Sequence, residues 1–406
     1  MPRNQSSAGL DFIRDLSTRV VTRLWRLPGW KFVLGMTKWR PLRIIELSRA
    51  TQNYEPLAID SAGLAAVYQD WEGGNYQPPI EAPHPVGLWR IKNGIVQLNS
   101  KFASVANSKE IMILPRVEEG PYFFYPSRAI GNASGVYSST SSHLLLRSRE
   151  KVISTAEAIY VGTRPATNWG HWLLNFLPGV MLASERFSSR MAPPLIVPPG
   201  YSGGESRIQL FTHFWGNRPI LECGETSEIR AANLYWIEQP VADSPRPINR
   251  SNIQPKIINI EVMKRFRSSV LDASGAIHNS KPFRKLFLAR EPHGKRPYNH
   301  DAVHNVAESK GFEIVYLNRL PVMEQISLIN QASKVVAPHG SGLANLIFAS
   351  PGVKVLVLAR SDLIEHWFAS FPALAGGESH VVVRDGTIEN PWEIDHEELG
   401  RLLDTF

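Results

Sequence analysis

The chain has 406 residues, of which 43% are hydrophobic and 20% charged, so it is neither fibrous nor disordered and can bury the cores of two to three domains of roughly 150 residues each. Lys and Arg outnumber Asp and Glu by 44 to 37, which favours an anionic partner without choosing between nucleic acid, acidic lipid and phosphorylated substrate. The single cysteine, Cys223, excludes an internal disulfide framework and indicates a reducing compartment. Because no run of about 18 apolar residues occurs and the N-terminus lacks an apolar signal core, we expect a cytoplasmic protein without a membrane span.

Residues 1–50 are predicted to form a basic N-terminal extension. Apolar residues recur at helical spacing over 10–27, with arginines between them, and Pro28-Gly29 should end this helix. Two interpretations remain open. Either the helix lies on an anionic membrane surface, which its basic face and Trp25 favour, or it packs on the protein's own core with that face in solvent.

Residues 51–245 are predicted to form a first α/β domain with a β-rich start. Short β-type runs alternate with turn residues from 87 to 149, and Asn93-Gly94 predicts a hairpin turn among them. After residue 157 strands and helices alternate, and Pro178 should end or kink the first helix. The expected elements are strands at 158–161, 195–197 and 234–237 and helices at 168–177 and 205–215.

Residues 240–255 contain four prolines and are predicted to link this domain to a second, Rossmann-like domain at 256–390. Its expected elements are strands at 286–289, 313–317, 334–337, 353–358 and 381–383 and helices at 257–271, 300–310, 322–332, 343–348 and 363–374, with a C-terminal helix in 391–406. The predicted fold class is therefore α/β, with two Rossmann-like domains facing a cleft at the carboxyl ends of their strands.

A histidine near the start of the helix at 168–177 is the first candidate for chemistry. In the sequence TNWGHWLLN, Thr167 or Asn168 can cap the helix, and His171 lies in its first turn with Asn175 on the same face. The positive helix end favours a neutral imidazole, which can accept a proton as a general base. The alternative is a structural histidine packed beside two tryptophans.

A set of cations follows the strand at 286–289. Arg290 stands at the carboxyl end of this strand, and Lys295 and Arg296 follow in a loop shaped by glycine and proline. Arginine makes bidentate contacts with phosphate, and such charges neutralise a diphosphate leaving group where no metal does so. The segment is either a phosphate site or a solvated basic loop.

The loop at 339–342, HGSG, joins a buried strand to a short apolar helix. Backbone N–H groups at such a helix start can hold an anion, although the loop alone is equally consistent with a tight turn. In the helix at 322–332, Gln325 can bond a base or a ribose. Its neighbour Glu324 is explained by the helix dipole.

Motifs for metal binding or for a nucleophile are not recognisable. The sequence has no acidic DxD-type pair after a strand, no HExxH, CxxC or histidine cluster, no GxSxG and no complete Walker A motif. Only the N-terminal helix approaches the basic and aromatic pattern of a nucleic-acid site. We therefore expect no metal, no organic cofactor and no nucleic-acid partner.

Three blocks of sequence, taken in order, resemble the family 61 glycosyltransferases (the DUF563 group), including bacterial capsular-polysaccharide members. The first block, HWLLNFLP at 171–178, is similar to the family pattern hWLL(D/N)xLP. The second, LFLAREPHGKRPYNHD at 286–301, is similar to lflsR…R…NE. The third spans 311–358 and contains EQI and PHGSGLANLIF. The resemblance covers residues 157–375.

The resemblance implies a GT-B architecture and an inverting transfer from a nucleotide sugar bound by the C-terminal domain. The donor-side residues that it implies are Arg290, Arg296, Gln325, His339, Gly340, Gly342 and Asn345. His171 and Asn175 fall on the first block of the family. We expect His171 to be the catalytic base, with Asn168 and Asn175 on the acceptor side.

The chain departs from the family pattern at three places. Asn299-His300 replaces the NE pair, Val357 replaces the acid of the last strand, and Asn175 stands where Asp is common. The change at Asn175 removes one candidate base, so His171 becomes the expected one.

The resemblance therefore predicts a metal-independent transferase that uses a UDP-sugar, with a hexose or a pentose as the sugar. The acceptor is a glycan or lipid-linked glycan in polysaccharide biosynthesis, and the basic extension docks the enzyme on the inner face of an anionic membrane. Two alternatives stay open: a nucleotide-sugar epimerase or hydrolase of the same fold, and a non-catalytic nucleotide- or glycan-binding protein, which the loss of the acid at Val357 favours.

Overall fold

The computed structural model describes residues 20, 39–45, 54–60, 64–68, 80–83, 86–97, 104–106, 110–113, 136–139, 143–147, 149–162, 168–188, 191–224, 226–243, 256–275, 281–292, 297–360, 367–384 and 392–406. Apart from Val20, the predicted helix at 10–27 lies outside these residues, as do Lys295 and Arg296. The chain forms two compact units. Unit 1 comprises Met1–Gly63, Pro83–Tyr201 and Phe214–Arg246, and unit 2 comprises Leu64–Ala82, Ser202–His213 and Pro247–Phe406.

The sheet of unit 1 has a parallel half built around β10 (Lys151–Tyr160). β10 pairs in parallel with β13 (Ser227–Ile237) and with β11 (Leu195–Val197), which pairs in parallel with β12 (Ile220–Glu222). β5 (Val86–Val96) runs antiparallel to β13 and begins the other half. The strand order of the whole sheet is β12-β11-β10-β13-β5-β6-β7-β1-β9-β8, and β2 also pairs with β5. The remaining strands are β1 (Trp39–Ile45), β2 (Tyr54–Asp60), β6 (Ser104–Ala106), β7 (Glu110–Ile113), β8 (Val136–Ser139) and β9 (His143–Arg147).

The hairpin predicted at Asn93-Gly94 is wrong, because β5 continues through both residues. Asn93 has a φ of +53°, a left-handed conformation that asparagine tolerates better than most residues. Gly94 is in register with Ala231 of β13, and a Cβ at Gly94 would come within 2.3 Å of Leu234. The turn signature thus marks a close approach of two strands within a continuous sheet.

After β10 the chain forms one helix in three parts. These are α3 (Trp169–His171), the π-helix η1 (Trp172–Phe176) and α4 (Leu177–Arg186). Pro178 does not end the helix. It follows the π-helical turn, in which the Leu177 N–H donates to Trp172 O five residues earlier, and α4 continues to Arg186. The helix therefore extends well beyond the predicted end at residue 177.

A glycine allows this helix to pack closely on the sheet of unit 1. A Cβ added at Gly179 would lie 2.8 Å from Val161 Cβ, so a larger residue would push α4 away from the end of β10. The buried apolar residues of the strands include Trp89, Ala158, Tyr160, Ile196, Leu234 and Trp236. The next helix, α5 (Glu205–Trp215), has the predicted bounds, as does β11.

The sheet of unit 2 has five parallel strands, as predicted. Its order is β17-β16-β18-β19-β20, and every neighbouring pair is parallel. The bounds are β16 (Arg284–Leu288), β17 (Glu313–Val315), β18 (Ala332–Pro338), β19 (Lys354–Arg360) and β20 (Glu378–Arg384). Taken in chain order, the strands lie as 2-1-3-4-5, which is the flavodoxin-like form of a doubly wound sheet.

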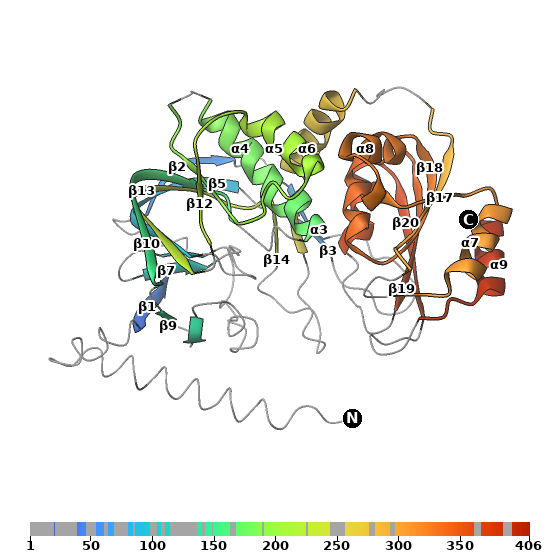
Figure 1. The fold of residues 1–406 in the computed structure, drawn as a ribbon, viewed down its shortest axis with the longest axis horizontal. Helices are drawn as coiled ribbons and strands as arrows, with labels where there is room; N and C mark the ends of the chain where they lie inside the picture. Colours follow the sequence, from blue (N-terminus) through green and yellow to red (C-terminus); the bar gives the residue numbers. More distant parts are fainter. Residues whose placement is uncertain are drawn as a thin grey trace. The chain divides into compact units, whose positions relative to one another are not determined.

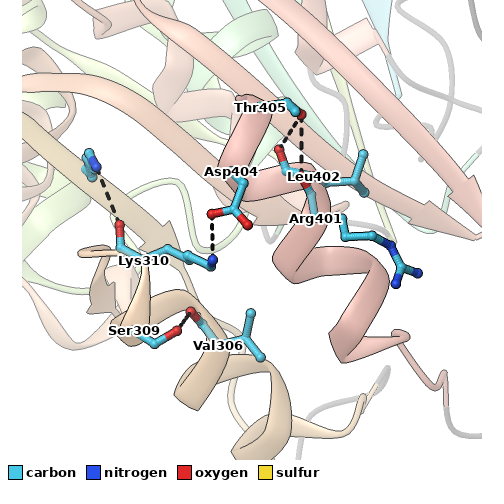
Figure 2. A network of polar contacts seen from close by, with 8 residues as sticks. Val306, Ser309, Lys310, Arg401, Leu402, Asp404 and Thr405 are labelled. Carbon is cyan, nitrogen blue, oxygen red and sulfur yellow. Dashed lines mark hydrogen bonds and ion pairs between the residues drawn. The ribbon is translucent and has the colours of Figure 1, made fainter.

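Helices cover both faces of this sheet (Figure 1). α7 (His300–Ser309) and α9 (His396–Thr405) pack together on one face, and α8 (Val322–Asn330) lies on the other. Figure 2 shows Lys310, just after α7, paired with Asp404 near the end of α9. The C-terminal helix is therefore part of unit 2 and is anchored to α7 by charge as well as by apolar contacts.

The other elements of unit 2 are α6 (Ile260–Ala273), the 3-10 helices η2 (Leu317–Arg319), η3 (Ser341–Phe348) and η4 (Trp367–Ala375), and the antiparallel pair β3 (Leu64–Tyr68) and β15 (Lys256–Asn259). The helix predicted from residue 257 begins later, because β15 pairs with β3 and Asn259 caps α6 through a hydrogen bond from Val262 N at 3.0 Å. Two further short strands are β4 (Ile80–Pro83) and, in unit 1, β14 (Val241–Asp243). Within the part of the chain that the structure describes, no helix is long and apolar enough to span a bilayer.

Candidate functional site

The strand order of unit 2 defines where a ligand can bind. The chain passes from β16 to β17 on one side of the sheet and then returns to β18 on the other, so the connections after β16 and β18 diverge. In doubly wound sheets this switch point, at the carboxyl ends of the two strands, is the usual ligand site. Arg290 follows β16, and the loop at 339–342 follows β18.

Arg290 lies beside the glycine loop. Its Nη1 donates a hydrogen bond to the backbone oxygen of His339 at 3.3 Å. A Cβ added at Gly340 would lie 3.8 Å from Arg290 Cζ, in ordinary contact with the guanidinium. A half-buried arginine and a residue without a side chain thus stand together at the switch point, an arrangement that suits an anion.

The short helix predicted after the loop is present, and it is a 3-10 helix. η3 has Gly340 as its N-cap, so no side chain caps its first backbone N–H groups. The Leu343 N–H closes the first turn onto the Gly340 oxygen at 3.0 Å. The partial positive charge of this helix start adds to that of Arg290.

Two of the predicted donor-side amides form a network next to the loop. Asn345 is fully buried and donates to Gln325 Oε1 at 3.3 Å and to Gly342 O at 3.2 Å. Gln325 donates to Leu320 O at 2.9 Å, so both ends of its amide are engaged within unit 2. We therefore expect Gln325 to support the loop rather than to bond a base or ribose. Asn345 Oδ1 is buried and accepts no hydrogen bond from the described residues.

The His339 side chain is buried, with 8% of its surface exposed. Its ring centroid lies 6.1 Å from that of Phe368 in η4, and its backbone N–H donates to Leu358 O of β19 at 2.7 Å. These contacts join the end of β18 to its neighbours. His339 therefore fixes the path of the loop, and its backbone oxygen meets Arg290.

A further cation at the same edge of the sheet was not predicted. Arg360 ends β19, the strand next to β18, and only 3% of its surface is exposed. The available signal was its position directly after an apolar strand, which is also the position of Arg290 after β16. Arg296 lies among residues that the structure does not describe, so its role stays a prediction.

Two of the residues at which the chain departs from the family pattern have a structural role in unit 2. Val357 is fully buried in β19, in register with Ala337 of β18, so the apolar side chain belongs to the core of the sheet. Asn299 ties the start of α7 to the chain before α9. Its Nδ2 donates to Ile394 O and its Oδ1 accepts from Ile394 N, both at 2.8 Å.

In unit 1, the helix after β10 holds His171. Asn168, one of the two predicted capping residues, caps this helix, with its Oδ1 accepting from the backbone N–H of His171 at 3.3 Å. The half-buried His171 ring has its Nδ1 3.0 Å from Asn175 Oδ1. Asn175 Nδ2 donates to Val241 O at 2.6 Å. The predicted pairing of His171 and Asn175 is therefore present, and β14 holds it in place.

These contacts fix the proton positions on His171. Because Asn175 Nδ2 donates to a carbonyl, its Oδ1 must face His171 and accept. A neutral His171 then carries its proton on Nδ1 and its lone pair on Nε2. Nε2 is thus the nitrogen that can take a proton from a hydroxyl group.

The π-helical turn that presents this pair was not predicted. η1 covers Trp172–Phe176, and single π-helical turns within α-helices occur frequently at functional sites. Trp172 is fixed on both sides, since its Nε1 donates to Tyr201 O at 2.7 Å and its ring stacks on Trp169 at 5.5 Å. No spacing signal in the sequence distinguishes such a turn from an α-helical one, because both place Asn175 near His171.

The described residues contain no cluster of metal ligands. No group of three or more His, Cys, Asp or Glu side chains lies close enough there to hold a metal ion. The charge available at the switch point comes from arginine and from backbone N–H groups.

Residues 169–356 match the sequence model of the family described as Glycosyltransferase 61, a segment of just under half the chain. The match begins at α3 and ends in β19, so it includes both His171 and the β16–β18 switch point. A search of curated proteins found no match. The family match supports the resemblance drawn from the three sequence blocks, which is a resemblance to glycosyltransferases.

Proposed function

We propose that the protein is an inverting glycosyltransferase of the GT-B type. It transfers the hexosyl or pentosyl group of a UDP-sugar to a glycan or a lipid-linked glycan. The observation that carries this proposal is the pairing of Arg290 with the glycine loop at the β16–β18 switch point, inside the segment that matches the family. Polysaccharide biosynthesis of the bacterial capsular type is the process that we propose for it.

The donor diphosphate binds at the switch point. Arg290 contacts it through its guanidinium, and Arg296 adds a second cation from the loop after β16. Gly340 and Gly342 leave room for the phosphate oxygens, which accept from backbone N–H groups at the start of η3. His339, Asn345 and Gln325 hold this loop in place.

The reaction is a direct displacement at the anomeric carbon. The acceptor hydroxyl oxygen forms the new bond to this carbon, and its proton moves to His171 Nε2. The bond from the anomeric carbon to the UDP oxygen breaks, and its electron pair leaves with the diphosphate. Arg290 and the start of η3 stabilise the charge that develops on this leaving group. Inversion follows because attack and departure take place on opposite faces of the sugar.

The acceptor side is built around His171. Asn168 fixes the helix start and Asn175 fixes the ring, so the lone pair on Nε2 has one direction. Productive orientation of this kind lowers the barrier by removing the entropy of alignment. Asn175 supplies no negative charge, so it orients the base without competing for its proton.

We also propose that the enzyme needs no metal, because Arg290, Arg296 and the η3 start provide the positive charge that metals supply elsewhere. Transfer measured with and without EDTA tests this. Loss of activity with EDTA, restored by added Mg²⁺ or Mn²⁺, would overturn it.

The place of action that we propose is the cytoplasmic side of an anionic membrane, where the basic extension at 1–50 would meet acidic lipids and a lipid-linked acceptor.

A two-stage experiment tests the function. A thermal-shift screen against nucleotide sugars identifies the donor, because a bound donor stabilises the fold by mass action. Incubation of that donor with glycan acceptors, followed by NMR of the product, gives the anomeric configuration. A new glycosidic bond of inverted configuration is expected. Free sugar or an epimerised donor as the main product would favour the hydrolase or epimerase, and binding without turnover would favour a non-catalytic protein.

A further inference from the structure

The two residues that follow Ala289 at the end of β16 make contacts on opposite sides of this strand. Arg290 donates to the backbone oxygen of His339 after β18, at the switch point. Glu291 is bonded to the segment after β17, on the other side of β16. The ends of β16 and β17 are joined as well, because Ala289 N donates to Val315 O at 2.8 Å. The carboxyl edge of the sheet therefore carries a second polar cluster beside the proposed diphosphate site.

The carboxylate of Glu291 is the centre of this cluster. Its Oε1 accepts from Asn318 Nδ2 at 3.0 Å and from Arg319 Nε at 2.8 Å, and its Oε2 accepts from Arg319 Nη2 at 2.7 Å. The Cζ of Arg319 also lies over the ring of Tyr316, 4.0 Å from its centroid. A bidentate ion pair and a cation–π contact thus hold Arg319, and Asn318 lies beside it on the same carboxylate oxygen.

The carboxylate also fixes which way the Asn318 amide faces. An ionised carboxylate only accepts hydrogen bonds, so the Nδ2 of Asn318 must face Glu291. Because Asn318 is exposed, its Oδ1 and the second N–H of Nδ2 are left for another molecule, as one acceptor next to one donor. Arg319 binds Glu291 through Nε and Nη2, which leaves the N–H groups of Nη1 outside this pair.

Stability gives little reason for such a cluster. The Arg319 side chain is 57% exposed and that of Glu291 36%, and exposed ion pairs add little to the free energy of unfolding. Side chains that are held in fixed orientation at the ligand edge of a doubly wound sheet suit the recognition of a ligand. In the proposed function Arg290 holds the diphosphate on one side of β16, so a group attached to the diphosphate can bind on the other side.

We propose that Asn318 and Arg319, oriented by Glu291, bind the nucleobase of the donor and select uracil. The pairing edge of uracil presents an N–H between two carbonyl oxygens. Asn318 Oδ1 accepts from this N–H and Asn318 Nδ2 donates to one of the two oxygens, while Arg319 donates to the other. Cytosine has an acceptor nitrogen in place of the N–H, so it would leave Asn318 Oδ1 without a donor. This inference rests on the proposed function, since it takes the diphosphate to lie at Arg290.

Calorimetric titration with three probes tests the proposal. UDP carries the base and the diphosphate, CDP differs from it only in the base, and inorganic pyrophosphate is the diphosphate alone. The wild type should bind UDP at least about 10-fold more tightly than CDP, because the wrong base leaves polar groups of the site unpaired. Equal affinity for UDP and CDP, or tighter binding of CDP, would overturn the assignment of uracil.

Asn318→Ala removes the amide at an exposed position, so the fold should be kept. The Kd for UDP should rise roughly 10-fold, the effect expected for two lost hydrogen bonds, and the preference for UDP over CDP should shrink. The Kd for pyrophosphate should not change. Arg319→Ala should act in the same direction on the same three probes. The matched control is Asn305→Ala, at another exposed asparagine of unit 2, which should bind all three probes as the wild type does.

The outcomes also separate this inference from the function on which it rests. If Arg290→Ala binds UDP and pyrophosphate as well as the wild type, the proposed diphosphate site itself fails. If Arg290→Ala weakens both while Asn318→Ala and Arg319→Ala leave the Kd for UDP unchanged, the diphosphate site stands and the nucleobase site is refuted. An equal loss of UDP and pyrophosphate affinity in Asn318→Ala would also refute it, because the effect would not depend on the base.

Discussion

His171 Nδ1 lies 3.0 Å from Asn175 Oδ1, and the Asn175 amide is itself held by the backbone oxygen of Val241 at 2.6 Å. A carboxylate in this place would attract the ring proton, whereas an amide only orients the ring. The pair therefore gives His171 a defined tautomer through a partner that is itself uncharged. Two predictions follow from this geometry, one for each residue.

Replacing His171 by Ala should lower kcat by about 100-fold to 10,000-fold, because general-base catalysis contributes a factor of that size. UDP affinity should not change, since His171 belongs to the acceptor side in the proposed reaction. Steady-state kinetics and UDP calorimetry on the same preparation measure both quantities. The exposed His396 of α9 offers a control, and His396→Ala should behave as the wild type. Undiminished turnover by His171→Ala would remove it as the base.

Replacing Asn175 by Leu keeps the branching and the number of heavy side-chain atoms but removes both amide contacts. The imidazole of His171 is then free to rotate and to change tautomer, so kcat should fall by roughly 10-fold with little change in donor KM. The double variant His171→Ala/Asn175→Leu should be no slower than His171→Ala alone, because Asn175 acts through the ring. A further fall in the double variant would show that Asn175 has a separate role.

The C-terminal helix should lose stability in acid. A hydrogen bond from Arg384 holds the pKa of Glu398 below its ordinary value, and backbone N–H groups of Glu398 and Glu397 do the same for the pKa of Asp395. A carboxyl group whose pKa is lower in the folded state stabilises the fold at pH values above its pKa in the unfolded state. This stabilisation is lost as the pH falls through the pKa of the folded state. The stabilisation is therefore complete at about pH 6 and is lost below about pH 4.

Urea unfolding of the wild type and of Glu398→Gln checks this prediction. The variant should be less stable at neutral pH, and the two stability curves should converge in acid, where the wild-type carboxyl is protonated as well. Glu397→Gln is the control, because Glu397 is an exposed neighbour whose contact with Arg401 is a long 4.0 Å. Curves that stay parallel down to low pH would show that Glu398 does not anchor the helix through its charge.

Deletion of residues 1–30 tests the membrane prediction. The removed segment contains the predicted basic amphipathic helix, so binding to vesicles of anionic lipid should weaken, whereas binding to neutral vesicles should stay equally low. Flotation or sedimentation of vesicles measures this, with transfer to a soluble acceptor as a control for folding. If both forms bind anionic vesicles equally, the helix serves the protein's own fold instead.

Local signals in the sequence were sufficient for most of the elements near the site. Leu195–Val197 and Glu205–Trp215 were predicted to the residue, because apolar runs bounded by proline, glycine and polar residues determine them locally. The five strands of unit 2 were found for the same reason. The Asn93-Gly94 turn signature failed, because the pairing of β5 with the long strand β13 outweighed a local preference.

The site depends on features that are not local. The strand order that brings Arg290 beside Gly340 is a property of the whole sheet, and neither segment reveals it alone. Gln325 was expected to face a ligand from its place in a helix first turn, but its amide is used by Asn345 and Leu320.

The central claim, that the β16–β18 switch point holds the diphosphate of a UDP-sugar, is tested most directly by calorimetric titration of UDP into the wild type and Arg290→Ala. The Kd should rise by about 10-fold to 100-fold in the variant, the loss expected for hydrogen bonds to a charged group. Arg284→Ala, at the opposite end of the same strand, where Arg284 pairs with Glu313, should bind UDP as the wild type does. Equal affinity in all three proteins, or no binding by the wild type, would contradict the claim.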